Sequence, residues 1–368
     1  MSSMTTAPFA STLELNQAAR TDAEREAILA SPGFGNHFTD HMFLTEWTPE
    51  AGWHDARVVP YGPLQLDPAT AVLHYAQEIF EGLKAYAWAD GSIRVFRPEQ
   101  NAARLQRSAH RLALPQLPED WFLGSISALV EADRSWVPQG GETSLYLRPF
   151  MFASEVFLGV RPSQHVTYCV IASPAGAYFP GGVEPVSIWL SSEYSRAGAG
   201  GTGAAKCGGN YAASLLPQQE ATAHGCQQVA FLDSVEHRWV EELGGMNLYF
   251  VQSDGSIVTP ELSGSILEGI TRDSILQIAR DLGHEVVERR VSIEEWREGT
   301  ADGTITEVFA CGTAAVVTPV GVLKWDGGEA VAGDGGAGKV TLDIRSALVD
   351  VQYGRAEDRH NWMRPVTD

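Results

Sequence analysis

Cysteine is scarce in this sequence, and its few positions lie far apart. Cys169, Cys207, Cys226 and Cys311 are the four cysteines among 368 residues, and they form no Cys-x-x-Cys pair. That number is too small for a disulfide framework in a chain of this length, and the spacing does not match a zinc site. We therefore expect free thiols and no structural metal.

Positive charge and long apolar runs are also in short supply. Lysine and arginine number 26 against 46 aspartates and glutamates, a formal net charge of −20 that repels nucleic-acid backbones and anionic membranes. No uncharged apolar run approaches the roughly 20 residues of a membrane span. The N-terminus has no basic start followed by an apolar core. We expect a cytoplasmic protein that binds neither nucleic acid nor membrane.

The chain is long enough for more than one domain. At 368 residues it exceeds the size at which single hydrophobic cores stop growing. Prolines and glycines crowd the stretch 174–183, which is typical of a linker or a shaped loop. We predict an N-terminal domain of residues 1–177 that begins with a flexible leader at 1–30, an interdomain loop at 178–185 and a larger C-terminal domain of residues 186–368.

Local patterns predict helices and strands mixed in both domains, an α+β or mixed α/β class. A hairpin turn at Asp90-Gly91 joins strands 83–88 and 93–97, and Pro98 then suits the first position of a helix. Further predicted strands are 144–152, 165–172, 186–190, 228–233, 237–242 and 246–252. Helices are predicted at 210–223, with a kink at Pro217, and at 265–282. A capping box is predicted at Ser292–Glu295, and a flexible glycine-rich loop at 326–338.

Lys206 stands alone in a segment, Arg196–Tyr211, that otherwise consists mostly of small residues. Glycines admit a bulky ligand because they have no Cβ, and lysine becomes a nucleophile towards carbonyls when its surroundings lower its pKa. The pattern is typical of a Schiff-base lysine. A flexible glycine-rich loop with an incidental lysine is the alternative.

The same segment contains the string Gly198-x-Gly200-x-x-Gly203, which matches the dinucleotide-binding fingerprint. That fingerprint opens directly into a helix, whereas Gly208-Gly209 interrupt here. A nicotinamide-dependent oxidoreductase therefore remains only a remote alternative.

Two further segments suit anion binding. Leu267–Thr271 precedes a predicted helix, and the backbone N–H groups of a helix start bind phosphate. Gly312–Ala315 follows a predicted strand and offers a second turn rich in N–H groups. Alternatively, the first segment is a plain helix N-terminus and the second a plain turn, without a ligand.

Adjacent acids at Glu241 and Glu242 lie in a strand-like run. Neighbouring strand residues face opposite sides, so one carboxylate should point inward while the other meets solvent. A buried carboxylate needs a partner, which a salt bridge or the protonated ring nitrogen of a cofactor provides.

Four ordered motifs, Phe80–Tyr86, Tyr178–Gly182, Lys206–Tyr211 and Glu242–Asn247, resemble those of the branched-chain amino acid aminotransferases, pyridoxal-phosphate enzymes of fold type IV with a D-amino acid aminotransferase-like fold. The resemblance runs in order from about Gly33 to Pro365. One departure concerns a Cys-x-x-Cys redox pair of animal members, because Ala315-Val-Val-Thr318 stands in those positions here.

The resemblance implies pyridoxal 5′-phosphate as the cofactor and Lys206 as its Schiff-base and proton-shuttling residue. It assigns Glu242 to the pyridine nitrogen and Tyr211 to the ring hydroxyl, and it gives Arg196 a supporting role. The implied phosphate contacts are Arg104, the backbone of Ile270 and Thr271, and the Thr313 hydroxyl. The resemblance assigns the N–H groups of Thr313 and Ala314 to the substrate carboxylate. It implies that the substrate side chain meets five aromatic residues, Phe38, Tyr75, Phe80, Tyr146 and Tyr178, and that Arg148 is available to the glutamate carboxylate.

The implied reaction is amino-group transfer between L-leucine, L-isoleucine or L-valine and 2-oxoglutarate, which gives branched 2-oxo acids and L-glutamate. The resemblance also implies a homodimer in which the second subunit completes the pocket. Another fold type IV activity, D-amino acid transamination or aminodeoxychorismate lysis, is the nearest alternative.

Overall fold

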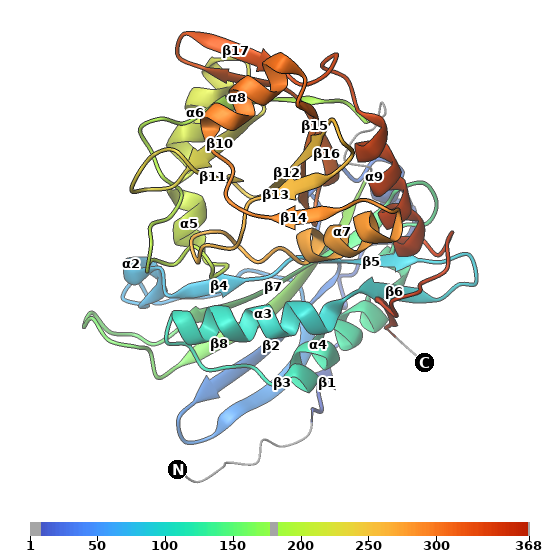
Figure 1. The fold of residues 1–368 in the computed structure, drawn as a ribbon. Coiled ribbons are helices and arrows are strands. Elements are labelled where there is room, and N and C mark those ends of the chain that lie inside the picture. Colours follow the sequence, from blue (N-terminus) through green and yellow to red (C-terminus); the bar gives the residue numbers. More distant parts are fainter. Residues whose placement is uncertain (1–8, 177–182, 367–368) are drawn as a thin grey trace. The chain divides into compact units, whose positions relative to one another are not determined.

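The computed structural model describes residues 9–176 and 183–366 and divides into two compact units. The first comprises Met1–Tyr178, Ala205–Gly208 and Val351–Asp368, and the second comprises Phe179–Ala204 and Gly209–Asp350. Each unit is built on its own nine-stranded sheet (Figure 1). In the described part of the chain, no helix is both long enough and apolar enough to cross a membrane.

The sheet of the first unit has a mostly antiparallel order, β1-β3-β2-β8-β7-β5-β6-β18, and β4 pairs with β7. Helix α4 packs on β2, β3 and β8, and α3 packs on α4 and β4 (Figure 1). The bounds are β1 Thr12–Leu13, α1 Asp22–Ala30, β2 His41–Thr48, β3 Gly52–Pro60, α2 Val72–Tyr75, β4 Glu78–Phe80, β5 Leu83–Ala87, β6 Ile93–Phe96, α3 Pro98–Arg111, α4 Glu119–Ala132, the 3₁₀ helix Arg134–Trp136, β7 Ser144–Ala153, β8 Val166–Ala175 and β18 Met363–Pro365.

Helix α3 shows how local sequence places a functional side chain. Pro98 occupies its first turn, as predicted, because proline lacks the N–H that would be unbonded there and its φ is already helical. Ala102, Leu105 and Ala109 recur at helical spacing and are buried in the core of the unit. Arg104 lies on the same buried side, so packing of the apolar stripe carries a guanidinium inside.

The described part of the leader at 1–30, which was predicted to be flexible, contains a short strand and a helix. The Thr21 hydroxyl accepts a hydrogen bond from the Glu24 backbone N–H, and the Glu24 carboxylate accepts one from the Thr21 N–H. This reciprocal capping box starts α1. Strand β1 pairs in parallel with β3 and adds the leader to the sheet.

The C-terminal segment belongs to the first unit, which differs from the predicted domain bounds. Met363 pairs with Phe96 where β18 joins β6, and Trp88 Nε1 donates to the Gln352 carbonyl at 3.0 Å. These long-range contacts draw the chain after residue 350 away from the predicted domain 186–368. Most of the predicted interdomain loop, residues 178–182, lies outside the described residues.

The second unit contains a mixed sheet in the order β11-β10-β9-β16-β15-β12-β13-β14, with β17 paired to β16. Helix α6 packs on β9 and β10, while α7 and α8 pack on β15. The bounds are β9 Val186–Leu190, α5 Gly208–Ala212, α6 Leu215–Ala223, β10 Gln228–Leu232, β11 Val240–Leu243, β12 Asn247–Gln252, β13 Ile257–Thr259, α7 Ile270–Asp281, β14 Val286–Glu288, α8 Ile293–Asp302, β15 Ile305–Gly312, β16 Val316–Trp325, β17 Gly328–Val331 and α9 Lys339–Gln352.

Two predicted helices of this unit have different bounds in the structure. The segment 210–223 forms parts of two helices with a break near Ala213, because the ring of Pro217 clashes with the carbonyl four residues earlier in a continuous helix. The segment 265–282 becomes helical only at Ile270, since the preceding backbone makes hydrogen bonds to side chains instead.

The glycine-rich stretch 326–338 is only partly a loop. Strand β17 pairs antiparallel with β16, and Trp325 lies opposite Gly328 in the register. A hairpin turn therefore replaces the first part of the predicted flexible loop. At the predicted capping box, the Ser292 hydroxyl accepts from the Glu295 N–H and starts α8.

Candidate active site

The backbone of Lys206 is fixed within the first unit, to which Ala205–Gly208 belongs. The Lys206 carbonyl accepts from the Phe80 N–H at 2.9 Å, and the Lys206 N–H donates to the Ser108 hydroxyl at 3.0 Å. Phe80 lies on β4 and Ser108 on α3. The lysine is therefore held between a strand and a helix, which argues against an incidental lysine in a flexible loop.

The Lys206 ammonium lies in surroundings that disfavour its charge. The side chain is partly buried, and Nζ is 4.7 Å from the centre of the Phe80 ring. Burial, followed by the nearby Arg104 guanidinium, lowers the pKa of Lys206 to about 8, although Glu81 opposes the change. The lowered pKa makes the neutral, nucleophilic form of the Lys206 amine far more accessible near physiological pH than it is for an ordinary lysine.

Gly208, two residues after the lysine, accommodates a carboxylate. Its N–H donates to Glu78 Oε1, and a Cβ at position 208 would overlap that oxygen. Burial raises the pKa of Glu78, while the Gly208 hydrogen bond and Arg148 lower it. Glycine at position 208 thus lets the Glu78 carboxylate approach the backbone closely, and Glu78 holds this end of the loop.

Arg104 is oriented by a buried carboxylate that the sequence reasoning did not assign. Its Nε and Nη2 donate to the two oxygens of Glu81, each at 2.8 Å, and Asn101 Nδ2 also donates to Glu81 at 2.8 Å. Glu81 lies within the Phe80–Tyr86 motif, which was the available signal. This bidentate pair fixes the guanidinium plane of an arginine predicted to bind phosphate.

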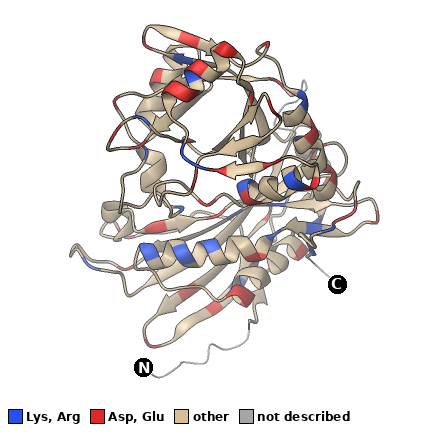
Figure 2. Cartoon of the chain, in the orientation of Figure 1, with Lys and Arg blue, Asp and Glu red and all other residues tan. Residues whose placement is uncertain are grey.

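Helix α3 carries Arg104, Arg107 and Arg111. Figure 2 shows basic side chains as blue bands along this helix. Over the whole chain acidic residues outnumber basic ones, 46 against 26, so α3 is a local concentration of positive charge in an acidic protein.

Three of the predicted substrate-binding side chains lie together in the first unit. The Arg148 guanidinium is 4.8 Å from the Phe80 ring centre and donates to the Tyr146 hydroxyl at 3.2 Å. A Cβ at Gly82 would overlap that hydroxyl, so glycine allows Tyr146 its position. Phe34, which was not predicted from the sequence, packs edge-on against Tyr146, with the two ring centres 5.0 Å apart.

The other predicted pocket aromatics make different contacts. Phe38 stacks on Tyr61 with ring centres 5.1 Å apart, and the Tyr75 hydroxyl donates to the Leu158 carbonyl. Tyr178 lies outside the described residues. The structure thus brings together Phe80, Tyr146 and Arg148, and the pocket roles of all six residues stay predictions.

In the second unit, Glu242 is almost completely buried and surrounded by donors. Its Oε1 lies 2.6 Å from Arg196 Nη2 and accepts from the Leu267 N–H at 2.9 Å, while Oε2 accepts from Asn247 Nδ2 at 3.2 Å. These donors favour the charged form of the carboxylate. Asn247 lay within the Glu242–Asn247 motif but was not assigned a role.

Arg196 explains how the glycine-rich loop keeps its shape. One of its nitrogens, Nη2, donates to the carbonyls of Gly203 at 2.9 Å and Ser265 at 2.6 Å, in addition to its ion pair with Glu242. A Cβ at Gly203 would overlap the Ser265 backbone. The supporting role of Arg196 is therefore to tie the loop before the lysine to the Glu242 carboxylate.

The start of α7 is suited to an anion. Gly269 occupies the N-cap position, and no side chain caps the helix there, so the first-turn N–H groups at Ile270 and Thr271 suit a ligand. Gly269 is needed because a Cβ at this position would overlap Asn247 Oδ1.

The turn that contains Thr313 and Ala314 joins β15 to β16. Asn247 pairs with Cys311 in the sheet, which places this turn beside the Gly244–Met246 turn. A Cβ at Gly245 would come 3.5 Å from the Tyr211 ring. Glu242, Tyr211 and the Thr313 turn therefore belong to one end of the second sheet.

Glu241 corrects the expectation that one of the adjacent acids meets solvent. It is 5% exposed and Glu242 is 2% exposed, so both carboxylates are buried. Strand alternation holds, but the segment that includes Ser265 covers the second face, and its hydroxyl donates to Glu241. Burial raises the pKa of Glu241, and Ser265 and Arg196 oppose this change.

The four cysteines are buried free thiols. Burial raises the pKa of Cys311 to about 12, which leaves it a poor nucleophile. Among the described residues, no group of three His, Cys, Asp or Glu side chains is arranged to hold a metal ion.

The functional groups found in each unit fit pyridoxal 5′-phosphate. The first unit supplies a lysine with a lowered pKa and a fixed arginine. The second supplies a buried carboxylate suited to a protonated ring nitrogen and a helix start suited to a phosphate. A lysine nucleophile combined with these groups is the chemistry of a pyridoxal-phosphate enzyme.

Comparison with known proteins agrees with this chemistry. Residues 78–323 match the amino-transferase class IV family. A crystal structure of the Escherichia coli branched-chain amino acid aminotransferase is 31% identical with a TM-score of 0.74, over 89% of this chain and 99% of that chain. The branched-chain amino acid aminotransferase of Thermobaculum terrenum, solved in its PLP form, is 25% identical with a TM-score of 0.71, over 89% and 98% of the two chains. These findings confirm the predicted fold class, that of a class IV aminotransferase.

Similar proteins of known name show to which kind of class IV aminotransferase the chain belongs. The probable branched-chain-amino-acid aminotransferase of Streptomyces coelicolor is 61% identical over 96% of this chain and 99% of its own length. The branched-chain-amino-acid aminotransferase of Mycolicibacterium smegmatis is 58% identical over 98% and 99%. This chain belongs to the branched-chain-amino-acid aminotransferase family, and its substrates are amino acids and 2-oxo acids. The family assignment overturns the nicotinamide-dependent alternative.

Proposed function

We propose that the chain uses pyridoxal 5′-phosphate to transfer the amino group between L-leucine, L-isoleucine or L-valine and 2-oxoglutarate. The products are the branched 2-oxo acids and L-glutamate. The observation that carries this proposal is 58–61% identity, over almost the whole chain, to branched-chain-amino-acid aminotransferases. When bound, the cofactor supplies a ring that accepts electron density from the substrate Cα.

Lys206 acts as the base and acid of the reaction in this proposal. With the cofactor bound, its Nζ would be the group that moves the proton between the substrate Cα and C4′ of the cofactor. A pKa of about 8 supports this role, because proton transfer is fastest when the pKa of the base lies near the working pH. The backbone bonds to Phe80 and Ser108 limit the positions that Nζ reaches.

Glu242 keeps the cofactor's ring nitrogen protonated by its negative charge. Its buried donors support a carboxylate that stays ionised. Tyr211 donates to the ring hydroxyl. For the phosphate we propose Arg104, the N–H groups of Ile270 and Thr271 and the Thr313 hydroxyl; for the substrate carboxylate we propose the N–H groups of Thr313 and Ala314.

Substrate choice follows from an aromatic pocket that contains Phe80 and Tyr146, to which we add Phe38, Tyr75 and Tyr178 as proposed wall residues. Apolar walls distinguish one methylene by only ~1–3 kcal/mol, so the three branched substrates should be used with similar efficiency. The Arg148 guanidinium, 3.2 Å from the Tyr146 hydroxyl, is available to the γ-carboxylate of glutamate.

A homodimer is part of the proposal because the first unit exposes an apolar patch. Val156, Leu158 and Val160 are 56%, 65% and 89% exposed, and Leu73 is 58% exposed. The Phe157 N–H donates to the Ala69 carbonyl at 3.1 Å, which brings the segments 69–75 and 155–160 together. Exposed apolar side chains in one patch are typical of a surface that a second subunit covers.

Light scattering after size exclusion tests the dimer. Val160→Asp should increase the fraction of monomer, whereas Leu282→Asp, which alters an exposed leucine of the second unit, should not. Equal effects of the two substitutions would contradict the choice of this patch.

An amino-acid panel with 2-oxoglutarate tests the activity. Leucine, isoleucine and valine should lie within about two orders of magnitude in kcat/KM. Alanine should be roughly 30-fold less efficient, because it lacks two or three carbons worth ~0.8 kcal/mol each. Aspartate should be nearly inert, because its charge would meet aromatic walls. Activity with D-amino acids but not L-amino acids would instead favour D-amino acid transamination.

A further inference from the structure

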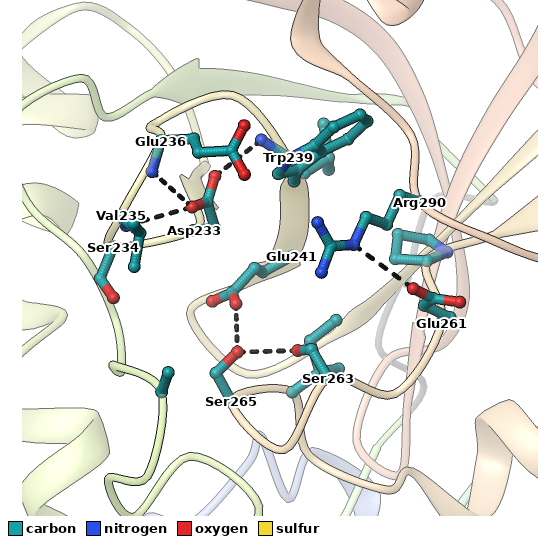
Figure 3. Close-up of a pocket in the computed structure, with 14 residues that line it drawn as sticks. Asp233, Ser234, Val235, Glu236, Trp239, Glu241, Glu261, Ser263, Ser265 and Arg290 are labelled. Atoms are coloured by element: carbon teal, nitrogen blue, oxygen red, sulfur yellow. Dashed lines mark hydrogen bonds and ion pairs between the residues drawn. The ribbon is translucent and has the colours of Figure 1, made fainter.

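A cavity of about 250 Å³ lies in the second unit, on the face of β11 opposite to Glu242 (Figure 3). The turn and strand at 233–241, the segment 260–266 and Arg290 line it. Glu241 and Glu242 are neighbours in a strand, so their side chains face opposite sides. The cavity is therefore separate from the groups proposed to hold the cofactor.

Glu241 is the unusual group in this cavity. It is 5% exposed, and its Oε1 accepts from the Ser265 hydroxyl, which lies 2.8 Å from the Ser263 hydroxyl. Its second oxygen, Oε2, is buried and has no hydrogen-bond partner. A buried carboxylate oxygen without a donor is costly, so this atom is suited to a donor brought by a ligand.

The remaining acids of the wall have other roles. Both oxygens of Asp233 accept backbone N–H groups within 233–239, at 2.7–3.1 Å. Although burial opposes them, these bonds lower the pKa of Asp233 to about 2, so its charge is permanent. Glu261 pairs with Arg290 at 3.4 Å across the rim. Glu236 is exposed.

The charge of the wall selects a cation. Asp233, Glu236, Glu241 and Glu261 are the acidic residues of the wall, and Arg290 alone among the lining residues is basic. The described residues lack a group of three acids, cysteines or histidines arranged for a metal ion. The Trp239 ring adds an aromatic surface to the wall. An organic cation with several N–H donors fits these features better than a metal.

We propose that this cavity binds a small primary ammonium compound whose N–H groups donate to Glu241 Oε2 and the serine hydroxyls. Two sources share this chemistry: a simple alkylamine, and an α-amino acid whose carboxylate also reaches Arg290. Arg290 and Glu241 both line the cavity, and Figure 3 shows the Glu241 carboxylate directed toward Ser265.

Calorimetric titration of the holoenzyme tests the proposal. The probes are n-butylamine and 2-aminoisobutyric acid, which has no hydrogen on Cα and so cannot be transaminated. We expect at least one probe to bind with one site per chain and without a change in the visible absorption of the cofactor. Tighter binding of the amino acid identifies the zwitterion as the ligand, and tighter binding of butylamine identifies the simple cation.

Three substitutions locate the site. Glu241→Gln should weaken binding at least about tenfold, because it removes a charged acceptor from a buried hydrogen bond. Ala199→Leu fills the cavity from an exposed lining position and should weaken binding without touching Glu241. Glu236→Gln is the matched control and should bind within about threefold of the unmodified protein, as expected for an exposed charge.

The proposal is overturned if neither probe binds at millimolar concentration. It is also overturned if Glu241→Gln and Ala199→Leu both bind as the unmodified protein does, or if binding always changes the cofactor absorption, which would place the probe at the cofactor. Because the readout is binding, failure here leaves the proposed transamination untouched.

Discussion

Lys206→Met should make the fold of the cofactor-free protein more stable, and it should abolish turnover when the cofactor is supplied. The lysine ammonium is held where burial and Arg104 oppose its charge. Methionine keeps the length and the apolar contact with Phe80 and removes the charge. Displacement of the lysine pKa from 10.5 to about 8 corresponds to about 3 kcal/mol of unfavourable free energy in the folded protein.

The pH dependence of this difference has a defined sign. Below pH 8 Lys206 is protonated in both the folded and the unfolded chain, so the unfavourable free energy of the buried ammonium destabilises the folded state fully. Between pH 8 and 10.5 the unfolded chain binds more protons, so the stability of the unmodified protein rises with pH. The difference in free energy of unfolding that favours Lys206→Met should therefore be greatest at pH 7 and should shrink as the pH rises from 8 to 10.5.

Urea unfolding of the two proteins between pH 7 and pH 10.5 measures the effect. Lys339→Met is the control, because Lys339 is exposed and pairs with Asp343 at the surface, so its removal should leave the stability and its pH dependence nearly unchanged. Equal or lower stability of Lys206→Met at pH 7, or a difference that does not vary with pH, would refute the argument that the fold imposes the lowered pKa.

Three further outcomes are expected. Glu242→Gln should lower kcat at least about 100-fold by removing the charge that keeps the ring nitrogen protonated, and steady-state kinetics should show a smaller loss for Glu241→Gln on the other face of the strand. Glu81→Gln should lower the free energy of unfolding by about 3–5 kcal/mol in urea titrations, because it leaves the Arg104 guanidinium buried without its partner. Hydrogen peroxide should not switch activity through a vicinal disulfide, since Ala315 and Thr318 occupy the positions of the redox pair; a large loss reversed by a thiol reductant would contradict this.

Local features of the fold were largely predictable from the sequence. Pro98 starts α3 and the strand at 186–190 has the predicted bounds, because both depend on neighbouring residues. The capping box at Thr21 was equally local, yet it was overlooked within a polar leader. The break before α6 shows that the effect of Pro217 falls on a carbonyl four residues earlier rather than on the proline itself.

Features that depend on distant contacts were not predictable in this way. The pairing of β18 with β6 joins residues far apart in the sequence, so no local pattern assigns the C-terminal segment to the first unit. Strand alternation correctly separated Glu241 from Glu242, but only the tertiary structure shows that Ser265 covers the second face. The pairing of Glu81 with Arg104 likewise depends on how α3 packs against the sheet.

Identification of the lysine that binds the cofactor tests the central claim most directly. The sequence contains only four lysines, Lys84, Lys206, Lys324 and Lys339. The holoenzyme is reduced with borohydride, digested and mapped by mass spectrometry. We expect a phosphopyridoxyl group on the peptide that contains Lys206 and on no other. A modified Lys84, Lys324 or Lys339 with an unmodified Lys206, or a protein that retains no cofactor after reduction, would contradict it.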